Sequence, residues 1–205
     1  TRSDVMGGAN IHVLDLASGM ERQGHDVTIL VGGNGILFDI ASAAGVKCVH
    51  VEHLKREISL VSDLRCFFYL RNILRESKPD LLHVHSSKAG FLGRFAAKSL
   101  DIPVVFTAHG WAFTEGVSII SKFFYKSLER LAAYSSTAII TVSNYDRDLA
   151  LDCNIGNSDL ITAVHNGVPD ILDVRQSKKY TGDNCKFLMV ARFDDQKNHC
   201  DLLNA

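Results

Sequence analysis

Residues 80–113, DLLHVHSSKAGFLGRFAAKSLDIPVVFTAHGWAF, set the class of fold. The stretch opens with a short apolar run at residues 80–86 and closes with another at residues 102–109. Residues 88–100, between these runs, indicate a helix. Short apolar runs bounded by turn signals predict buried strands, and strands that alternate with helices predict parallel pairing. We therefore expect a strand–helix–strand unit within a parallel sheet.

The same alternation runs through most of the chain. Residues 9–23 carry apolar side chains at three- and four-residue spacing and end at Gly24, as an amphipathic helix does. Further helices are expected at residues 36–44, 63–77, 119–134 and 144–153, and further strands at residues 26–31, 46–51, 137–143 and 159–168. This pattern predicts an α/β fold, a Rossmann-like parallel sheet flanked by helices on both faces. Ligands of such sheets bind beyond the carboxyl ends of the strands.

The chain is expected to divide into three parts. Residues 1–168 form one Rossmann-like domain, which lacks a strand pattern ahead of its first helix. Residues 169–185 are polar and without a clear period, which indicates a linker. Residues 186–205 predict one strand, at 186–191, and a helix that starts near residue 196. One strand and half a helix are too little to bury a core of their own.

Composition excludes several classes of protein. The formal net charge is −1, whereas general nucleic-acid binding requires an excess of basic side chains along the phosphates. Five cysteines, none in a CxxC pair, indicate reduced thiols and a cytoplasmic protein rather than a disulfide framework. No apolar run approaches the ~20 residues of a spanning helix, and the first ten residues lack the core of a signal peptide.

Two predicted strand ends carry candidate binding residues. Gly7 and Gly8 open the first helix, where free amides and the helix dipole favour an anion, although a plain tight turn explains the glycines equally well. His109 follows the strand at residues 102–109 and is a candidate for catalysis or substrate binding, or a structural histidine. Trp111 and Phe113 would line a substrate or pack the loop.

His83 and His85 alternate by two and so share a face of their strand. They form a candidate metal pair, but no third ligand lies at a recognisable sequence spacing, so no metal site is predicted. The favoured interpretation is that His85 and the following serines cap the next helix.

Arg192 and Lys197 flank the turn after the strand predicted at residues 186–191. Two cations beside a helix start suit a diphosphate better than a carboxylate. A solvated charged turn is the alternative, since Asp194 and Asp195 lie next to them.

Five stretches occur in this order along the whole chain: GGANIHVLDLASGMERQGHDVTIL, residues 80–113, AIITVSNYDRDLAL, VHNGV and FLMVARFDDQKN. In this order and spacing the chain resembles the retaining family-four glycosyltransferases, especially bacterial enzymes that build exopolysaccharide, capsule or O-chains. The resemblance implies the GT-B fold, in which two Rossmann-like domains face each other, with residues 1–168 as the acceptor-side domain. Residues 186–205 would be the first strand and helix start of the donor-binding domain.

The resemblance implies a set of site residues. Arg192 and Lys197 would hold the diphosphate of a UDP- or GDP-sugar, and Gly7 and Gly8 would lie near the same group. His109 matches the family's histidine at the reacting centre.

On the acceptor side, His109 and Asn10 would contact a lipid-linked or oligosaccharide acceptor, while Asn166 and Gly167 match a pair near the hinge. The resemblance implies no cofactor and no catalytic metal.

Two departures limit what this chain should do by itself. The family's first strand and its E-x7-E element, which holds the donor sugar, have no counterpart here. We therefore expect a transferase in the intact protein and little activity from the chain as given. A non-catalytic sugar- or partner-binding domain of the same fold remains an alternative, and a nucleotide-sugar epimerase is a weaker one.

The helix at residues 63–77 raises the question of a membrane surface. Basic residues are concentrated at 53–78 and are interleaved with Phe67, Phe68 and Tyr69. Such a helix can lie on an anionic membrane, at the inner face in this case, but the aromatic side chains also fit a core.

Overall fold

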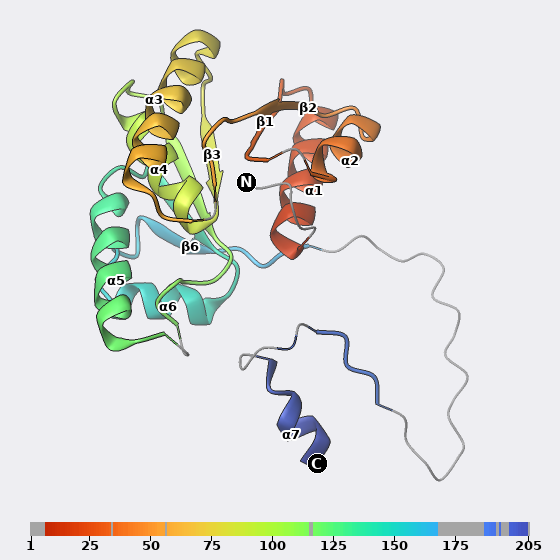
Figure 1. Ribbon diagram of the computed structural model, residues 1–205, viewed down its shortest axis with the longest axis vertical. Coiled ribbons are helices and arrows are strands. Elements are labelled where there is room, and N and C mark those ends of the chain that lie inside the picture. Colours follow the sequence, from red (N-terminus) through yellow and green to blue (C-terminus); the bar gives the residue numbers. More distant parts are fainter. Residues whose placement is uncertain are drawn as a thin grey trace.

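The computed structural model describes residues 7–33, 35–55, 57–114, 117–167, 187–191, 193 and 197–204. Within them, helices and strands alternate from the start (Figure 1). The helices are α1 (Gly8–Arg22), α2 (Leu37–Ala43), α3 (Leu60–Ser77), α4 (Ser87–Lys98), α5 (Ile119–Ala133), α6 (Asn144–Asp152) and α7 (His199–Asn204). The strands are β1 (Thr28–Val31), β2 (Lys47–His50), β3 (Leu82–His85), β4 (Val104–Ala108), β5 (Ala138–Thr141) and β6 (Ile161–Ala163). Each helix and strand predicted between residues 9 and 168 has a counterpart, although the strand predicted at residues 159–168 is much shorter and covers Ile161–Ala163.

The predicted parallel sheet is present in two parts. β1 pairs with β2, and β3, β4, β5 and β6 form a four-stranded sheet in that order. All four strand pairs are parallel, as predicted. Neighbouring strands of one sheet are joined by backbone hydrogen bonds. Among the described residues no strand is hydrogen-bonded to both β1 and β3, so the two parts are separate sheets.

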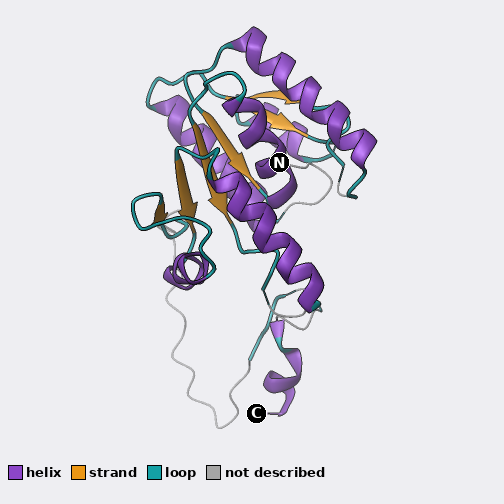
Figure 2. Ribbon diagram, turned by 90° about the vertical axis from the view of Figure 1, so that its left-hand side faces the viewer, coloured by secondary structure: helices purple, strands orange, loops and turns teal. Residues whose placement is uncertain are grey.

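Helices cover both parts of the sheet. α4 lies between α3 and α5 and packs on β3 and β4, while α6 packs on β5 and β6 (Figures 1 and 2). The main apolar core fills the space between these helices and the four-stranded sheet. A second, smaller core joins α1 and α2 to β1 and β2.

Glycines let α4 approach the sheet closely. A Cβ atom at Gly93 would lie 2.7 Å from Cγ1 of Val84, and one at Gly90 would lie 2.8 Å from Cε2 of Phe106. Both distances are too short for a methyl group, so the fit of α4 on β3 and β4 requires small residues here.

We expect Gly93→Ala to lower the free energy of unfolding by about 1–2 kcal/mol, because overpacking outweighs the better helix propensity of alanine. Gly19→Ala is the matched control, since its Cβ would come no nearer than 3.8 Å to Nη2 of Arg22. That change is expected to stabilise α1 by about 0.5–1 kcal/mol. Urea unfolding of both variants measures the difference, and equal effects would contradict the packing argument.

The C-terminal part matches the sequence prediction only at its helix. α7 confirms the expected helix near residues 196–205, although it is shorter. The strand predicted at residues 186–191 is wrong for its described part, because residues 187–191 form no strand and pair with none. A strand requires a partner for its backbone groups, and the side chains of Phe187, Leu188 and Val190 are exposed. The linker predicted at residues 169–185 lies outside the described residues.

Candidate functional site

Four histidines meet at the carboxyl ends of β3 and β4; we call His12, His83, His85 and His109 the histidine cluster. β3 ends at His85, which lies opposite Thr107 in the paired strand β4. β4 ends at Ala108, so His109 is the first residue beyond it. His12 comes from α1, four residues after Gly8 and thus about one helical turn into the helix.

The rings of the histidine cluster are in mutual contact. Nδ1 of His85 and Nε2 of His109 are 3.2 Å apart, within hydrogen-bond distance. The rings of His12 and His109 meet edge to face with centroids 5.1 Å apart, and His83 stacks on His85 with centroids 4.4 Å apart. Nε2 of His83 also hydrogen-bonds Oγ1 of Thr107 at 2.8 Å. The cluster therefore connects α1 to both strand ends.

Burial keeps three of these imidazoles neutral. His85 is buried, and desolvation followed by the neighbouring His83 and His109 lowers its pKa to about 2. Desolvation, and then His12 and His109, lower the pKa of His83 to about 4. Desolvation and then His12 lower the pKa of His109 to about 4. A neutral imidazole has one N–H donor and one free nitrogen, so within the His85–His109 pair one ring donates and the other accepts.

A neutral histidine in this setting can take a proton, donate a hydrogen bond or bind a metal ion. His109 is only half-buried, so its ring is open to a bound molecule, while His85 behind it is buried. The arrangement resembles a reacting group held in place by a second group deeper in the protein.

The start of α1 lies beside this cluster. Gly7 is the N-cap residue, and a Cβ atom at Gly7 or Gly8 would meet nothing within 4 Å. Neither glycine is therefore required by packing. The amides of Asn10 and Ile11 donate to the carbonyl of Gly7, so the amides of Gly8 and Ala9 are the candidates for an anion site. Asn10 is buried on the same helix. The structure thus brings Gly7, Gly8 and Asn10 to the same edge as His109.

The capping role predicted for His85 and the serines is wrong. Ser86 is the N-cap residue of α4, but its side chain makes no capping hydrogen bond. Its backbone has φ 68° and ψ 152°, far from the extended conformation that places a serine hydroxyl over the helix amides. His85 instead contacts His83 and His109.

The backbone at Ser86 is strained, because only glycine adopts this region without cost. We expect Ser86→Gly to raise the free energy of unfolding by about 1 kcal/mol. Ser87→Gly, one residue later in the regular helix, should lower it by about 0.5–1 kcal/mol. Chemical denaturation of the two variants measures this, and a loss of stability in both would show that Ser86 is not strained.

Comparison with known proteins places the chain in a family. The family model described as "Glycosyltransferase Family 4" matches residues 6–170. The chain belongs to glycosyltransferase family 4. The predicted resemblance is confirmed, and the family match decides against the epimerase alternative.

Two curated relatives are bacterial glycosyltransferases. The chain is 31% identical over 211 residues to "UDP-Gal:alpha-D-GlcNAc-diphosphoundecaprenol alpha-1,3-galactosyltransferase" of Escherichia coli, covering 93% of this chain and 54% of the relative. It is 28% identical over 138 residues to "Capsular polysaccharide biosynthesis glycosyltransferase CapM" of Staphylococcus aureus, covering 67% of this chain and 35% of the relative. The chain thus spans about half or less of the length of these two relatives.

A solved structure shares the fold. The Anabaena protein Alr3699/HepE, solved in complex with UDP and glucose, matches with a TM-score of 0.61 at 17% identity. The match covers 82% of this chain and 43% of that protein. At this identity the likeness shows the fold alone, which is the Rossmann-like N-terminal half of the GT-B architecture.

The aromatic side chains after β4 pack the loop of this family-4 domain. Trp111 and Phe113 are buried and stack with ring centroids 5.4 Å apart. Nε1 of Trp111 donates to the carbonyl of Asp146 in α6 at 2.8 Å. Of the two interpretations from sequence, loop packing is therefore the one that the structure favours, and this packing fixes the segment that carries His109.

Lys197, one of the two donor-side cations of the family resemblance, is not brought to the cluster. Lys197 is exposed, just before α7, and Figure 1 shows α7 apart from the sheet. Arg192 lies outside the described residues. Their diphosphate role therefore stays a prediction.

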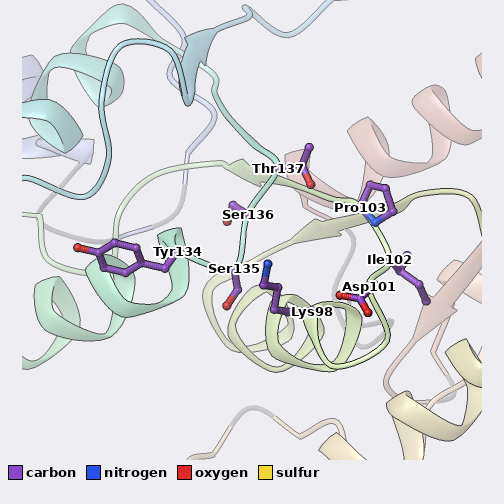
Figure 3. A pocket seen from close by; sticks show the side chains of 8 residues that line it. All are labelled: Lys98, Asp101, Ile102, Pro103, Tyr134, Ser135, Ser136 and Thr137. Atoms are coloured by element: carbon purple, nitrogen blue, oxygen red, sulfur yellow. The ribbon is translucent and has the colours of Figure 1, made fainter.

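The described part of the chain also has a hollow of about 210 Å³ at the other edge of the sheet (Figure 3). It is lined by the turns that precede β4 and β5, including Asp101, Tyr134 and Ser136. These turns lie at the amino ends of the strands. Ligands of open parallel sheets bind at the carboxyl ends, so this hollow is not the functional site.

Sequence reasoning missed His12. It lies some seventy residues from His83 in sequence, and a single histidine in an amphipathic helix has no distinguishing pattern. Its position at the first turns of α1, beside the glycines, was the only available signal.

Proposed function

We propose that the protein containing this chain transfers a sugar from a nucleoside-diphosphate sugar to a lipid-linked or oligosaccharide acceptor, with retention of configuration, in bacterial surface polysaccharide synthesis. The observation that carries the proposal is His109, held by His85 at the carboxyl edge beside the open start of α1. The Escherichia coli relative, named for a UDP-galactose donor and a diphosphoundecaprenol-linked acceptor, supports a UDP-sugar and a lipid-linked acceptor.

The residues take different parts in this reaction. His109 faces the reacting centre and orients or deprotonates the acceptor hydroxyl, and Asn10 contributes to acceptor binding. Gly7 and Gly8 allow the donor diphosphate to approach the amides of α1.

Charge stabilisation acts on the leaving group. The bond from the sugar to the diphosphate breaks while the acceptor oxygen bonds to the sugar, so negative charge develops on the nucleoside diphosphate. Arg192 and Lys197 neutralise that charge, which is electrostatic stabilisation of the transition state.

The test is sugar transfer by the intact protein. Labelled UDP- and GDP-sugars are offered with a bacterial membrane extract, and label is measured in the lipid and oligosaccharide fractions. Arg192→Ala is expected to lower transfer about 10²–10³-fold, while Arg22→Ala, an exposed change at the end of α1, leaves it unchanged. An α-linked product from an α-linked donor supports retention. No transfer and no nucleotide binding with any donor would overturn the enzyme and leave the binding-module alternative.

Contact with a membrane is a separate part of the proposal. Among the described residues no helix is long and apolar enough to cross a membrane. Exposed apolar side chains instead line α3 and α5, which flank α4 on one side of the sheet (Figure 1). They include Leu60, Val61, Leu64 and Phe68 on α3, and Ile119, Ile120, Phe123 and Phe124 on α5.

We propose that this face rests on an anionic membrane at its inner surface, where a lipid-linked acceptor would lie. In α3, Phe67 and Tyr69 pack on the core, so Phe68 is the aromatic side chain available to lipid. Co-sedimentation with phosphatidylglycerol vesicles should weaken after Phe68→Ser and after charge reversal at Arg71 and Arg75. Unchanged sedimentation in these variants would exclude α3 as the contact.

A further inference from the structure

The geometry points to a binding site for Zn²⁺ or a similar transition-metal ion, formed by His12, His85 and His109. One nitrogen from each of the three rings lies within 4.8 Å of the other two. Imidazole nitrogens are among the most common ligands of zinc.

The distances fit a tetrahedral ion after small ring movements. Zinc lies about 2.0–2.1 Å from each nitrogen, so two ligands of a tetrahedral site are roughly 3.4 Å apart. The His85–His109 pair is already at 3.2 Å. The widest separation, up to 4.8 Å, has to shorten, which requires the half-buried rings of His12 and His109 to turn.

The fold itself holds the three ligands close together without a bound ion. Its three ligands come from α1, from the end of β3 and from the residue after β4, so tertiary structure alone brings them together. His83 stacks on His85 with an interplanar angle of 29° and bonds Thr107, which fixes the orientation of the central ligand. Stacking on this anchored ring limits the rotation of the His85 ring.

Three protein ligands leave a fourth position for water or another oxygen ligand. No carboxylate belongs to the group of converging side chains found among the described residues.

Occupancy of this site would inhibit transfer, and this consequence rests on the proposed function. The ion would bind Nε2 of His109 and Nδ1 of His85 in place of the hydrogen bond between them, and the proton of that bond would move to the other nitrogen of its own ring. This binding removes His109 from the acceptor side of the reaction.

Metal binding is tested first, without any measurement of activity. Tag-free protein is treated with chelator, titrated with Co²⁺ as a visible probe and then with Zn²⁺. We expect one Co²⁺ per chain with the absorption of a tetrahedral site, and its displacement by Zn²⁺. His12→Gln should weaken Co²⁺ affinity at least tenfold.

Controls separate this site from other ligands. His25→Gln changes an exposed histidine on the turn after α1, and Cys200→Ser removes an exposed thiol; neither should alter Co²⁺ binding. Circular dichroism confirms that His12→Gln is folded. Failure of the wild type to bind Co²⁺ or Zn²⁺, or equal affinity in His12→Gln, would overturn the site.

The activity arm uses the intact protein. Zn²⁺ should reduce sugar transfer, chelator should restore it, and His12→Gln should require at least tenfold more Zn²⁺ for the same inhibition. If no transfer is found at all, the proposed function fails while the Co²⁺ titration still decides the metal site. Transfer that Zn²⁺ leaves unchanged at saturating occupancy would contradict the inhibitory role.

Discussion

Lowering the pH from about 7 to about 5 is expected to reduce the free energy of unfolding by about 4 kcal/mol through His83 and His85 alone. Burial lowers the pKa of both imidazoles in the folded protein, to about 4 and about 2. The cluster gives them no compensating carboxylate. Acid should therefore unfold this protein at a pH that most globular domains tolerate.

The sign follows from proton binding in the two states. In the unfolded chain each histidine takes a proton near its ordinary pKa of about 6.5. In the folded protein both stay neutral until much lower pH, so between about pH 6.5 and 4 the unfolded state binds more protons. Their contribution to stability is fully present above the unfolded pKa and is lost as the pH falls. His109 adds to the effect, by less because its ring is more exposed to solvent.

Urea unfolding at the two pH values, in chelator, measures the effect. In His85→Asn the loss between the two pH values should be smaller by about 2 kcal/mol, because one titrating group is gone. His25→Asn, an exposed histidine, should show the wild-type difference. An unchanged pH dependence in His85→Asn would mean that the cluster does not stay neutral in the folded state.

Glu129→Ala is the second change with a large expected effect. Nη2 of Arg94 in α4 contacts Oε2 of Glu129 in α5 at 2.6 Å, and both side chains are buried. The guanidinium also lies 4.2 Å over the ring of Phe106 and donates from Nε to the carbonyl of Gly90 at 3.0 Å. Its Nη1 is buried without a hydrogen-bond partner among the described residues.

Removal of the carboxylate leaves an uncompensated charge in the core. Burial already lowers the pKa of Arg94, and Glu129 opposes that change. Glu129→Ala should therefore lower the free energy of unfolding by about 3–5 kcal/mol.

Thermal and urea unfolding test this, with Glu76→Ala on the exposed face of α3 as the control, expected within about 0.5 kcal/mol of wild type. The double change Arg94→Met with Glu129→Leu should recover most of the loss, since it removes both charges. A double variant as unstable as Glu129→Ala would show that packing, rather than the unpaired charge, is responsible.

Much of the fold could be predicted from short-range pattern. Strands such as β4 are apolar runs, and helices such as α1 show a clear period and a terminating Gly24, so both signals lie within a few neighbouring residues. The strand expected at residues 186–191 shows the limit of this reasoning. Its residues have strand composition, but a strand exists only with a partner, and residues 187–191 have none.

The site was predicted in part, for a related reason. His109 could be found because it directly follows a predicted strand, where parallel sheets bind ligands. His85 was identified but given a local role, since capping involves near neighbours, while its actual partner His109 is 24 residues away. His12 and the Arg94–Glu129 pair depend on helix packing across the fold, which no local pattern shows. Arg192 and Lys197 came from spacing and family resemblance, and they stay predictions.

We propose that His109 acts at the reacting centre of a glycosyltransferase. The most direct test is transfer of label from a UDP-sugar to a lipid-linked acceptor by the intact protein, with His109→Ala compared with His25→Ala. We expect His109→Ala to stay folded and to lose about 10²–10⁴-fold in kcat/KM, while His25→Ala transfers sugar at the wild-type rate. Wild-type transfer by folded His109→Ala would contradict it and leave the histidine cluster with a structural role.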